Sequence, residues 1–434
     1  MQIFTFIWLG QLISLLGVAM TGFAMEIWVY QQTNSATQFA LLNLCYTIPL
    51  LLISPIAGTF VDRWDRRWIM IISHVGEGLC TLILILLISI GQLEIWQIFL
   101  SNIFRAITVA FHSPAYKASI ISLVSEEDLS RVNSMIQLGR GIQRIISPLL
   151  AGIMLELIGI RSILIIDFIT LFAAFVPLVL VRFPYVNKAT DGNNDTSRSS
   201  FLKETLYGWT YLTDRSGLFG FIIMFTIYQL MMGFVNILSL PLILSLTTPS
   251  GLGWILFLCG IGIFLGTIVM NIWKSKEQKL VDSMLIAMSF NGLLIIIAGL
   301  RPSIIQFAIA ALCFFMGMSF INVSVQTILQ TRIPGSVQGR IFGLTGAIWG
   351  ATAPLGGIVA GPLADYVFEP RMAFDGIWSQ ELVGQVIGSG PGRGVGLLFV
   401  IIGCCILVTA FVSSQYAALR NLEVDLPNLN LQKV

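Results

Sequence analysis

Long apolar runs dominate this chain, and short polar connectors separate them. A helix that crosses a lipid bilayer needs roughly 20 mostly apolar residues. Twelve runs meet that requirement, so the pattern predicts an all-α membrane protein with twelve transmembrane helices. We expect these helices at residues 4–30, 39–61, 69–91, 94–114, 135–157, 162–183, 217–243, 252–273, 281–300, 303–327, 340–366 and 394–416.

The composition supports a membrane protein. Charged residues make up 11% of the chain and hydrophobic residues 56%, whereas a soluble domain has about 25% charged residues. The first apolar run is longer than a signal-peptide core and has no basic region before it, so we expect it to be retained as a helix. The six cysteines lie inside apolar runs without metal-ligand spacing, which predicts small buried hydrophobes.

The chain shows no set of residues for enzyme catalysis. It has no nucleophile elbow and no nucleotide-hydrolysis motif, and the glycines of 388–394 lack the spacing of a phosphate-binding loop. We therefore expect no enzyme activity, no metal, no cofactor and no nucleic-acid partner. Energy for any transport would come from an ion gradient, with protons as the expected ion.

One stretch concentrates charge between two apolar runs. Residues 62–67 contain five charges in six positions. Cytoplasmic loops are enriched in Lys and Arg. If this loop is cytoplasmic, nineteen of the 24 Lys and Arg residues lie on its side and four on the other. The sequence thus predicts a multi-pass protein of the inner or plasma membrane with both termini in the cytoplasm.

The chain is organised as two halves. The polar stretch 184–216 predicts a cytoplasmic linker between an N-terminal half, 1–183, and a C-terminal half, 217–434. The halves repeat each other: Pro148 and Pro354, which we expect to bend their helices, stand among small residues about 206 positions apart, each after a polar connector. Two parallel six-helix halves describe one broad transporter architecture.

The run Gly58-x-x-x-Asp62-Arg63-x-x-Arg66-Arg67 resembles the loop 2–3 signature of the major facilitator superfamily. Within that superfamily, the residues from Arg105 to Ala115 and Ile146-Ser-Pro148 resemble the macrolide-efflux branch of the drug:proton antiporters. The resemblance covers nearly the whole chain. It implies two pseudo-symmetric six-helix bundles that alternate between inward- and outward-facing states. It also implies export of amphipathic small organic molecules, such as macrolide-like drugs, by proton antiport.

The chain departs from the family pattern in two places. The glycine series that antiporters carry in helix 5 is reduced to Ser147-Pro148-Leu-Leu-Ala151-Gly152. The segment from Tyr366 to Gly394 forms a longer extracytoplasmic loop than macrolide exporters have. Other cargoes on the same fold therefore stay open, namely a siderophore, a lysolipid or another solute. A membrane sensor that does not transport is the alternative from a different class.

The charged loop also has a mechanistic interpretation. Asp62 is expected near the start of helix 11 in the other half, where a helix N-terminus stabilises a carboxylate by about 0.3–1 kcal/mol. Gly58, one turn earlier, would let the two helices approach. The resemblance implies that Gly58, Asp62, Arg63, Arg66 and Arg67 form a latch between the halves. The alternative is that the arginines serve only as topology anchors.

Ionisable residues inside a membrane are costly and mark candidate functional positions. Arg105 lies in the middle of helix 4, and the resemblance links an arginine there to proton coupling; a buried ion pair is the structural alternative. Glu26 of helix 1 is our first choice as proton carrier, because helix 1 lines the central cavity in this fold. Glu77, on one face with His74, and Asp167, which would alternatively pair near Arg161, are further candidates.

The substrate should meet soft and aromatic side chains, which repack around varied hydrophobic cargo. We expect the cavity to be lined by residues of helices 1 and 7: Met25, Trp28, Tyr228, Met232 and Asn236. The predicted partners are a small hydrophobic or amphipathic substrate and membrane lipid, with the protein acting as a monomer.

Overall fold

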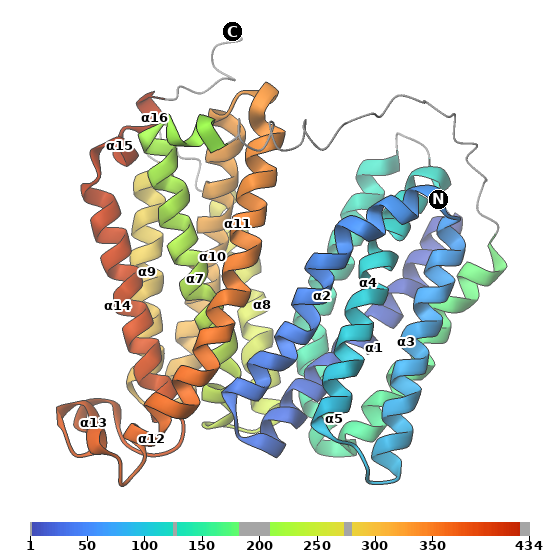
Figure 1. Ribbon diagram of the computed structural model, residues 1–434, viewed down its shortest axis with the longest axis horizontal. Coiled ribbons are helices and arrows are strands. Elements are labelled where there is room, and N and C mark those ends of the chain that lie inside the picture. Colours follow the sequence, from blue (N-terminus) through green and yellow to red (C-terminus); the bar gives the residue numbers. More distant parts are fainter. Residues whose placement is uncertain (1, 125–127, 182–208, 273–279, 426–434) are drawn as a thin grey trace. The chain divides into compact units, whose positions relative to one another are not determined.

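The computed structural model describes residues 2–124, 128–181, 209–272 and 280–425 (Figure 1). Within these ranges the regular structure is helical and contains no strand, which confirms the all-α membrane fold. The long helices are α1 (Gln2–Thr33), α2 (Ala36–Arg63), α3 (Arg66–Ser89), α4 (Ile95–Leu123), α5 (Leu129–Leu180), α7 (Ser216–Leu244), α8 (Pro249–Ile272), α9 (Leu280–Leu300), α10 (Ile304–Arg332), α11 (Gly335–Pro362) and α14 (Arg393–Gln415).

Ten of the described helices are long and apolar enough to cross a membrane. One of them covers Arg131–Leu180 and corresponds to two predicted spans, 135–157 and 162–183. Gly159, between these spans, interrupts the helical backbone. Gly159 has φ 74° and ψ 168°, a conformation that only glycine adopts without strain. Helix α4 (Ile95–Leu123) overlaps the predicted span 94–114 but is not among those ten. The described helices are consistent with twelve spans, and the exact count stays a prediction.

The chain divides into two compact units. One, which we call the N-terminal half, comprises Met1–Ala189 together with Thr247–Phe257; the other, the C-terminal half, comprises Thr190–Leu246 and Leu258–Val434. The first turns of α8 therefore pack with the N-terminal half. Most of the predicted linker 184–216 lies outside the described residues. Within its described part, residues 209–213 are helical.

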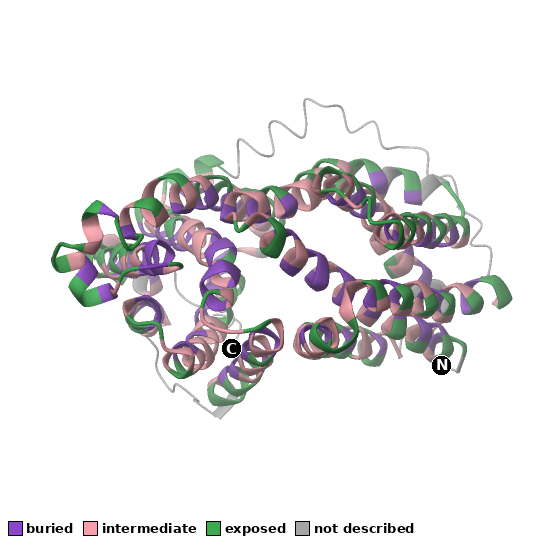
Figure 2. Ribbon diagram, turned by 90° about the horizontal axis from the view of Figure 1, so that it is seen from below, coloured by how far each residue is buried: buried purple, intermediate pink, exposed green. Residues whose placement is uncertain are grey.

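Each half buries part of its helices and leaves many apolar side chains exposed. In the N-terminal half α1 packs along α5, α2 packs on α4, and α3 packs on both α4 and α5. Buried residues recur on one side of most helices and exposed residues on the other (Figure 2). Leu52, Leu157 and Ile286 are among the large apolar side chains on exposed faces. Such faces suit contact with lipid, as expected of a multi-pass membrane protein.

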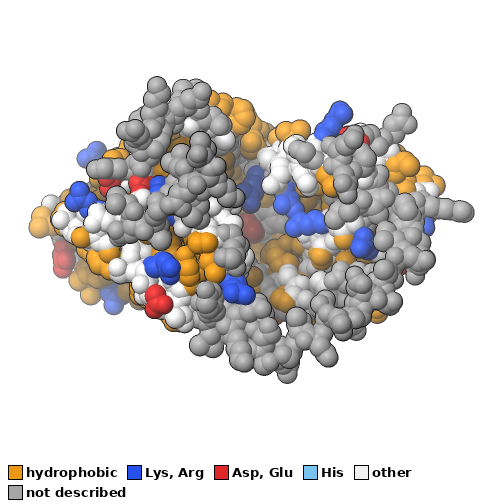
Figure 3. Space-filling view, turned by 90° about the horizontal axis from the view of Figure 1, so that it is seen from above, with side chains coloured by type: hydrophobic (Ala, Val, Ile, Leu, Met, Phe, Trp, Pro, Cys, Tyr) orange, Lys and Arg blue, Asp and Glu red, His pale blue; other side chains and the backbone are white. Residues whose placement is uncertain are grey.

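One end of the N-terminal half gathers several chain segments. Phe4, Tyr116, Val124 and Leu129 pack together with Val132, so the start of α1, the end of α4 and the start of α5 meet there. The turn between α2 and α3 lies at the same end, which we call the charged end. Lys and Arg side chains are visible on the corresponding face of the molecule in Figure 3.

The long loop predicted between the last two spans is folded. It contains a π-helix, η2 (Leu363–Phe368), the short helices α12 (Glu369–Met372) and α13 (Leu382–Ile387), and a 3₁₀ turn, η3 (Ile377–Ser379). The Glu369 carboxylate accepts hydrogen bonds from the backbone N–H of Gly392 at 3.1 Å and of Val395 at 2.9 Å. These donors belong to the first turn of α14, so the loop caps that helix.

Two prolines predicted to bend helices lie inside long helices. Pro148 is within α5 and Pro354 within α11. The break within α5 lies eleven residues after Pro148, at Gly159. Bending at the two prolines stays a prediction.

Candidate functional site

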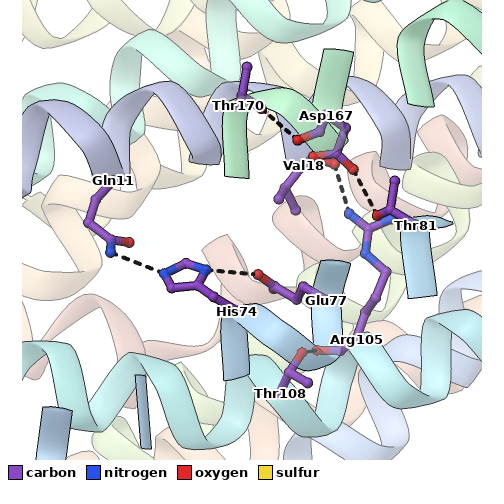
Figure 4. A network of polar contacts seen from close by, with 9 residues as sticks. All are labelled: Gln11, Val18, His74, Glu77, Thr81, Arg105, Thr108, Asp167 and Thr170. Atoms are coloured by element: carbon purple, nitrogen blue, oxygen red, sulfur yellow. Dashed lines mark hydrogen bonds and ion pairs between the residues drawn. The ribbon is translucent and has the colours of Figure 1, made fainter. Parts of the chain in front are cut away.

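The N-terminal half carries a polar cluster in its interior, and Arg105 of α4 is its cation. Its side chain is 8% exposed, and Nη2 donates a hydrogen bond of 2.9 Å to the backbone carbonyl of Val18 in α1. In the part of the chain that the structure describes, no Asp or Glu oxygen lies within ion-pair distance of Arg105. The carboxylates of Glu77 and Asp167 belong to the same cluster (Figure 4).

Asp167 of α5 is the most deeply buried of these carboxylates, at 2% exposed. Its Oδ2 accepts a hydrogen bond of 3.2 Å from Thr81 of α3. Helix α1 comes very close here: a Cβ on Gly17 would lie 2.1 Å from Oγ1 of Thr170 and 3.1 Å from Oδ1 of Asp167. Glycine at this position therefore lets α1 reach the buried carboxylate. Asp167 does not pair with Arg161, since Arg161 is exposed and Asp167 faces the interior.

His74 and Glu77 continue the cluster along α3. The Nδ1 atom of His74 lies 3.5 Å from Oε2 of Glu77, and its Nε2 lies 3.1 Å from the amide nitrogen of Gln11 in α1. The amide donates to Nε2, so the neutral imidazole carries its proton on Nδ1, facing Glu77. Figure 4 shows His74 between Gln11 and Glu77, with Arg105 and Asp167 beyond Glu77. Helix α3 thus contributes polar side chains to the interior of this half.

His112 belongs to the same cluster, although it was not among the residues predicted from the sequence. Its ring, on α4, lies edge-on to His74 with ring centroids 4.7 Å apart, and stacks on Tyr116 at 6.0 Å. These are the two histidines of the whole chain. The rule that flagged His74, an ionisable side chain within a predicted span, applies equally to His112.

Glu26 lies two turns from Val18 on α1 and is half-buried. Its neighbour Met25 does not line a cavity, contrary to our expectation. Met25 is 2% exposed and packs in an apolar cluster with Val29 and Leu84, against which Trp28 also packs. Both residues therefore contribute to the core of their own half, because this face of α1 turns toward α2, α3 and α5.

In the C-terminal half, Tyr228 is likewise buried rather than cavity-lining, at 1% exposed. Its hydroxyl accepts a hydrogen bond of 3.2 Å from Nδ2 of the buried Asn291 on α9. On the same helix as Tyr228, Met232 is half-buried and Asn236 is exposed. An exposed amide on an apolar helix is a candidate for contact with water or substrate, so the prediction is retained for these two residues.

Arg66 and Arg67 bind helix ends within the N-terminal half. Nη1 of Arg66 donates to the carbonyl of Ala118 in α4 at 2.8 Å. Arg67 donates to the carbonyls of Leu178 at 2.8 Å and Val179 at 2.5 Å, in the last turn of α5. Since the last carbonyls of a helix lack partners within it, Arg67 caps α5. Together, Arg66 and Arg67 hold α3 against α4 and α5.

Within its described part, the structure gives no contacts that would show a role for the other members of the predicted latch, Gly58, Asp62 and Arg63. Within its own half, a Cβ on Gly58 would meet no atom within 4 Å, so local packing does not demand glycine there. The side chains of Asp62 and Arg63 lie outside the described part of the structure, and the latch stays a prediction.

Replacing Arg67 with alanine should loosen the end of α5. Two charge-assisted hydrogen bonds would be lost, and because both are partly open to solvent we expect a loss of about 1 kcal/mol in stability. The thermal midpoint of the detergent-solubilised protein, followed by size-exclusion chromatography, measures this. Arg67→Lys should recover part of the loss. A midpoint for Arg67→Ala equal to that of the native chain would contradict the capping role.

Residues 7–366 match the family profile of the Major Facilitator Superfamily. The chain belongs to the major facilitator superfamily. It is 28% identical over 369 residues to macrolide efflux protein A of Streptococcus pyogenes, covering 83% of this chain and 89% of that protein. It is 23% identical over 356 residues to the multidrug efflux pump Tap of Mycolicibacterium fortuitum, covering 78% and 83%.

The fold also matches solved structures. The crystal structure of the nucleoside transporter NupG aligns with a TM-score of 0.66 at 12% identity, over 96% of this chain and 100% of that one. At this identity the likeness shows the fold alone. Membership in a family of transporters confirms the expectation that this chain is not an enzyme.

Proposed function

We propose that this protein is a secondary active transporter that exports amphipathic small organic molecules in exchange for protons. The observation that carries the proposal is the buried cation Arg105 in one polar cluster with the carboxylates of Glu77 and Asp167 (Figure 4), inside the N-terminal half of a superfamily member. Ionisable groups inside membrane bundles mark ion pathways and proton relays. The relatives named as macrolide and multidrug efflux proteins support the direction of transport and the class of cargo.

The roles follow from the geometry. Arg105 is held to α1 by the Val18 carbonyl, while Asp167 is held to α3 by Thr81. The cluster therefore joins α1, α3, α4 and α5, and a change in its protonation can alter the packing of these four helices. Glu26, which is half-buried, is the carboxylate that a substrate could approach from outside the cluster. Proton binding at one carboxylate and substrate binding beside it would then compete, as antiport requires.

The setting of the protein follows from the same proposal. It resides in the inner or plasma membrane with both termini in the cytoplasm, and it works as a monomer without a cofactor, driven by the proton gradient. The charge bias of its loops supports this orientation.

Proteoliposomes provide the test. With an acidic lumen, the reconstituted protein should accumulate a radiolabelled macrolide and, at the same time, release protons from the lumen, reported by a trapped pH dye. Liposomes without protein, and proteoliposomes whose gradient has been collapsed by an ionophore, are the controls. Proton movement in the same direction as the substrate would indicate uptake by symport. Absence of any substrate movement, with lysolipids and siderophores tried as well, would favour a sensor over a transporter.

The latch prediction has its own test. Asp62→Asn should slow the transport cycle by up to about fivefold, because the neutral amide no longer interacts with a helix N-terminus as a charge does. The initial rate of gradient-driven macrolide accumulation measures it. Asp65→Asn is a matched control: Asp65 is exposed and caps α3 by accepting a hydrogen bond of 2.8 Å from the backbone of Arg67. If Asp62→Asn turned over at the native rate, the latch would have to be abandoned.

A further inference from the structure

His112 and Tyr116 extend the polar cluster toward the charged end of the N-terminal half. Along α4, Arg105 and Tyr116 are eleven residues apart, or roughly 16 Å at 1.5 Å per residue. Tyr116 lies two residues before Ala118, whose carbonyl receives Arg66 at the charged end. His112 lies between Arg105 and Tyr116 on this helix. Polar side chains thus recur from the end of the bundle to its centre.

The neighbouring helix α3 carries further polar side chains of this series. From Arg67 at the charged end, His74 lies roughly 10 Å and Thr81 roughly 21 Å along the helix axis. Glu77 lies between them and Thr81 binds Asp167. The ring contact of 4.7 Å between His74 and His112 joins the two helices midway. The series therefore spans α3 and α4 through ring contacts, and it relies on no contact between the halves.

Buried polar atoms without a hydrogen-bond partner among the described residues recur in this series. They include Nδ1 of His74, which faces Glu77 at 3.5 Å, and Oδ1 of Asp167. On α4 they are Nε2 of His112 and the hydroxyl oxygen of Tyr116. A buried polar atom without a partner is costly, and native proteins keep such atoms for a reason. Structural packing alone would be served by apolar side chains of similar shape at both positions. Groups that must accept and pass on a proton explain why polar ones are present.

Acidic, basic and neutral polar side chains surround the two histidines. On α3, Glu77 and Cys80 face this region, and Tyr46 faces it from α2. Helix α4 adds Arg105 and Tyr116, and helix α5 adds Asp167 and, beside Tyr116, Arg140. Helix α1 contributes the neutral Gln11. Glu77 therefore offers a negative charge beside His74, at 3.5 Å, for a proton that arrives on the imidazole.

We propose that Tyr116, His112, His74 and Glu77 form a proton path that links the Arg105–Asp167 centre to the charged end of the N-terminal half. Each imidazole takes up a proton on one nitrogen and releases one from the other. Only N–H and O–H bonds form and break, and one proton leaves the path for each one that enters. This inference rests on the proposed proton antiport and assigns the route by which the proton reaches the carboxylates.

Reconstituted full-length protein allows a test with two readouts. The first is macrolide accumulation driven by an acidic lumen, and the second is exchange of labelled for unlabelled macrolide at equal pH on both sides. We expect Tyr116→Phe and His112→Gln to slow gradient-driven accumulation at least fivefold while exchange stays within twofold of the native rate. Tyr416→Phe, an exposed tyrosine of the C-terminal half, is the matched control.

The remaining outcomes separate the possibilities. Native rates for both variants in both assays would overturn the path. An equal fall in accumulation and in exchange would also overturn it, because it would assign the residues a structural role. If the native protein still released protons as it moved substrate, the proposed antiport would stand in both cases. A native protein that moves substrate without moving protons would overturn the antiport and the path together.

Discussion

Replacing Arg105 with alanine should reduce proton-driven export at least tenfold while the protein stays folded in the membrane. Arg105 is the buried cation of the cluster that contains Glu77 and Asp167 (Figure 4), and its removal takes a positive charge out of a medium of low dielectric constant. A tenfold loss corresponds to about 1.4 kcal/mol in the limiting step. The helices themselves keep their apolar contacts, and the one hydrogen bond lost is to the Val18 carbonyl.

Gradient-driven macrolide accumulation in proteoliposomes, with protein amounts matched by chromatography, measures the effect. Arg105→Lys keeps the charge but lacks the planar group that reaches Val18, so we expect partial activity. Arg161→Ala removes an exposed arginine of the same half and should transport at the native rate. Unchanged pH-driven export by Arg105→Ala would show that the buried arginine has only a structural role.

Replacing Gly10 with valine should strongly destabilise the N-terminal half. A Cβ at this position would lie 2.1 Å from the carbonyl oxygen of Ala173 and 3.2 Å from the ring of Pro177, so α1 and α5 would have to separate. Backbone atoms cannot move aside as a flexible side chain can. Overpacking of this kind costs about 1–3 kcal/mol, and the branched side chain places the effect at the upper end of that range.

The thermal midpoint of the purified protein measures this change, and the yield of folded protein from membranes gives a second reading. Gly22→Val is the control on the same helix, because a Cβ on Gly22 meets nothing within 4 Å. Gly10→Ala should give an intermediate loss. Equal midpoints for Gly10→Val and Gly22→Val would mean that α1 and α5 do not pack as closely as the structure shows.

Both predictions concern α1, and together they describe how this half is built. Gly10 and Gly17 bring α1 against α5, and the carbonyl of Val18 then lies within reach of Arg105. The close packing therefore positions the polar cluster as well as stabilising the half. A change at Gly10 should for this reason lower transport along with stability, whereas Arg105→Ala should lower transport alone.

The helices themselves could be predicted from the sequence with good accuracy. A membrane span is decided by length and apolarity along a single segment, so the predicted spans 217–243 and 281–300 differ from α7 and α9 by one residue at each end at most. The break at Gly159 was also signalled by the gap between two predicted spans. The family signature around Gly58 and Arg66 is equally local, and it led to the superfamily that the profile match over residues 7–366 confirms.

The sequence alone also identified Arg105, Glu26, Glu77 and Asp167 as candidates, because an ionisable residue inside an apolar run is visible without a structure. Only the tertiary structure decided which of them meet. It placed Met25 and Tyr228 in the cores of their halves and joined His112 to His74 from a separate helix. The physical reason is that helix rotation is set by packing between helices, and a span that is apolar on all sides carries almost no sequence signal for the face it turns inward.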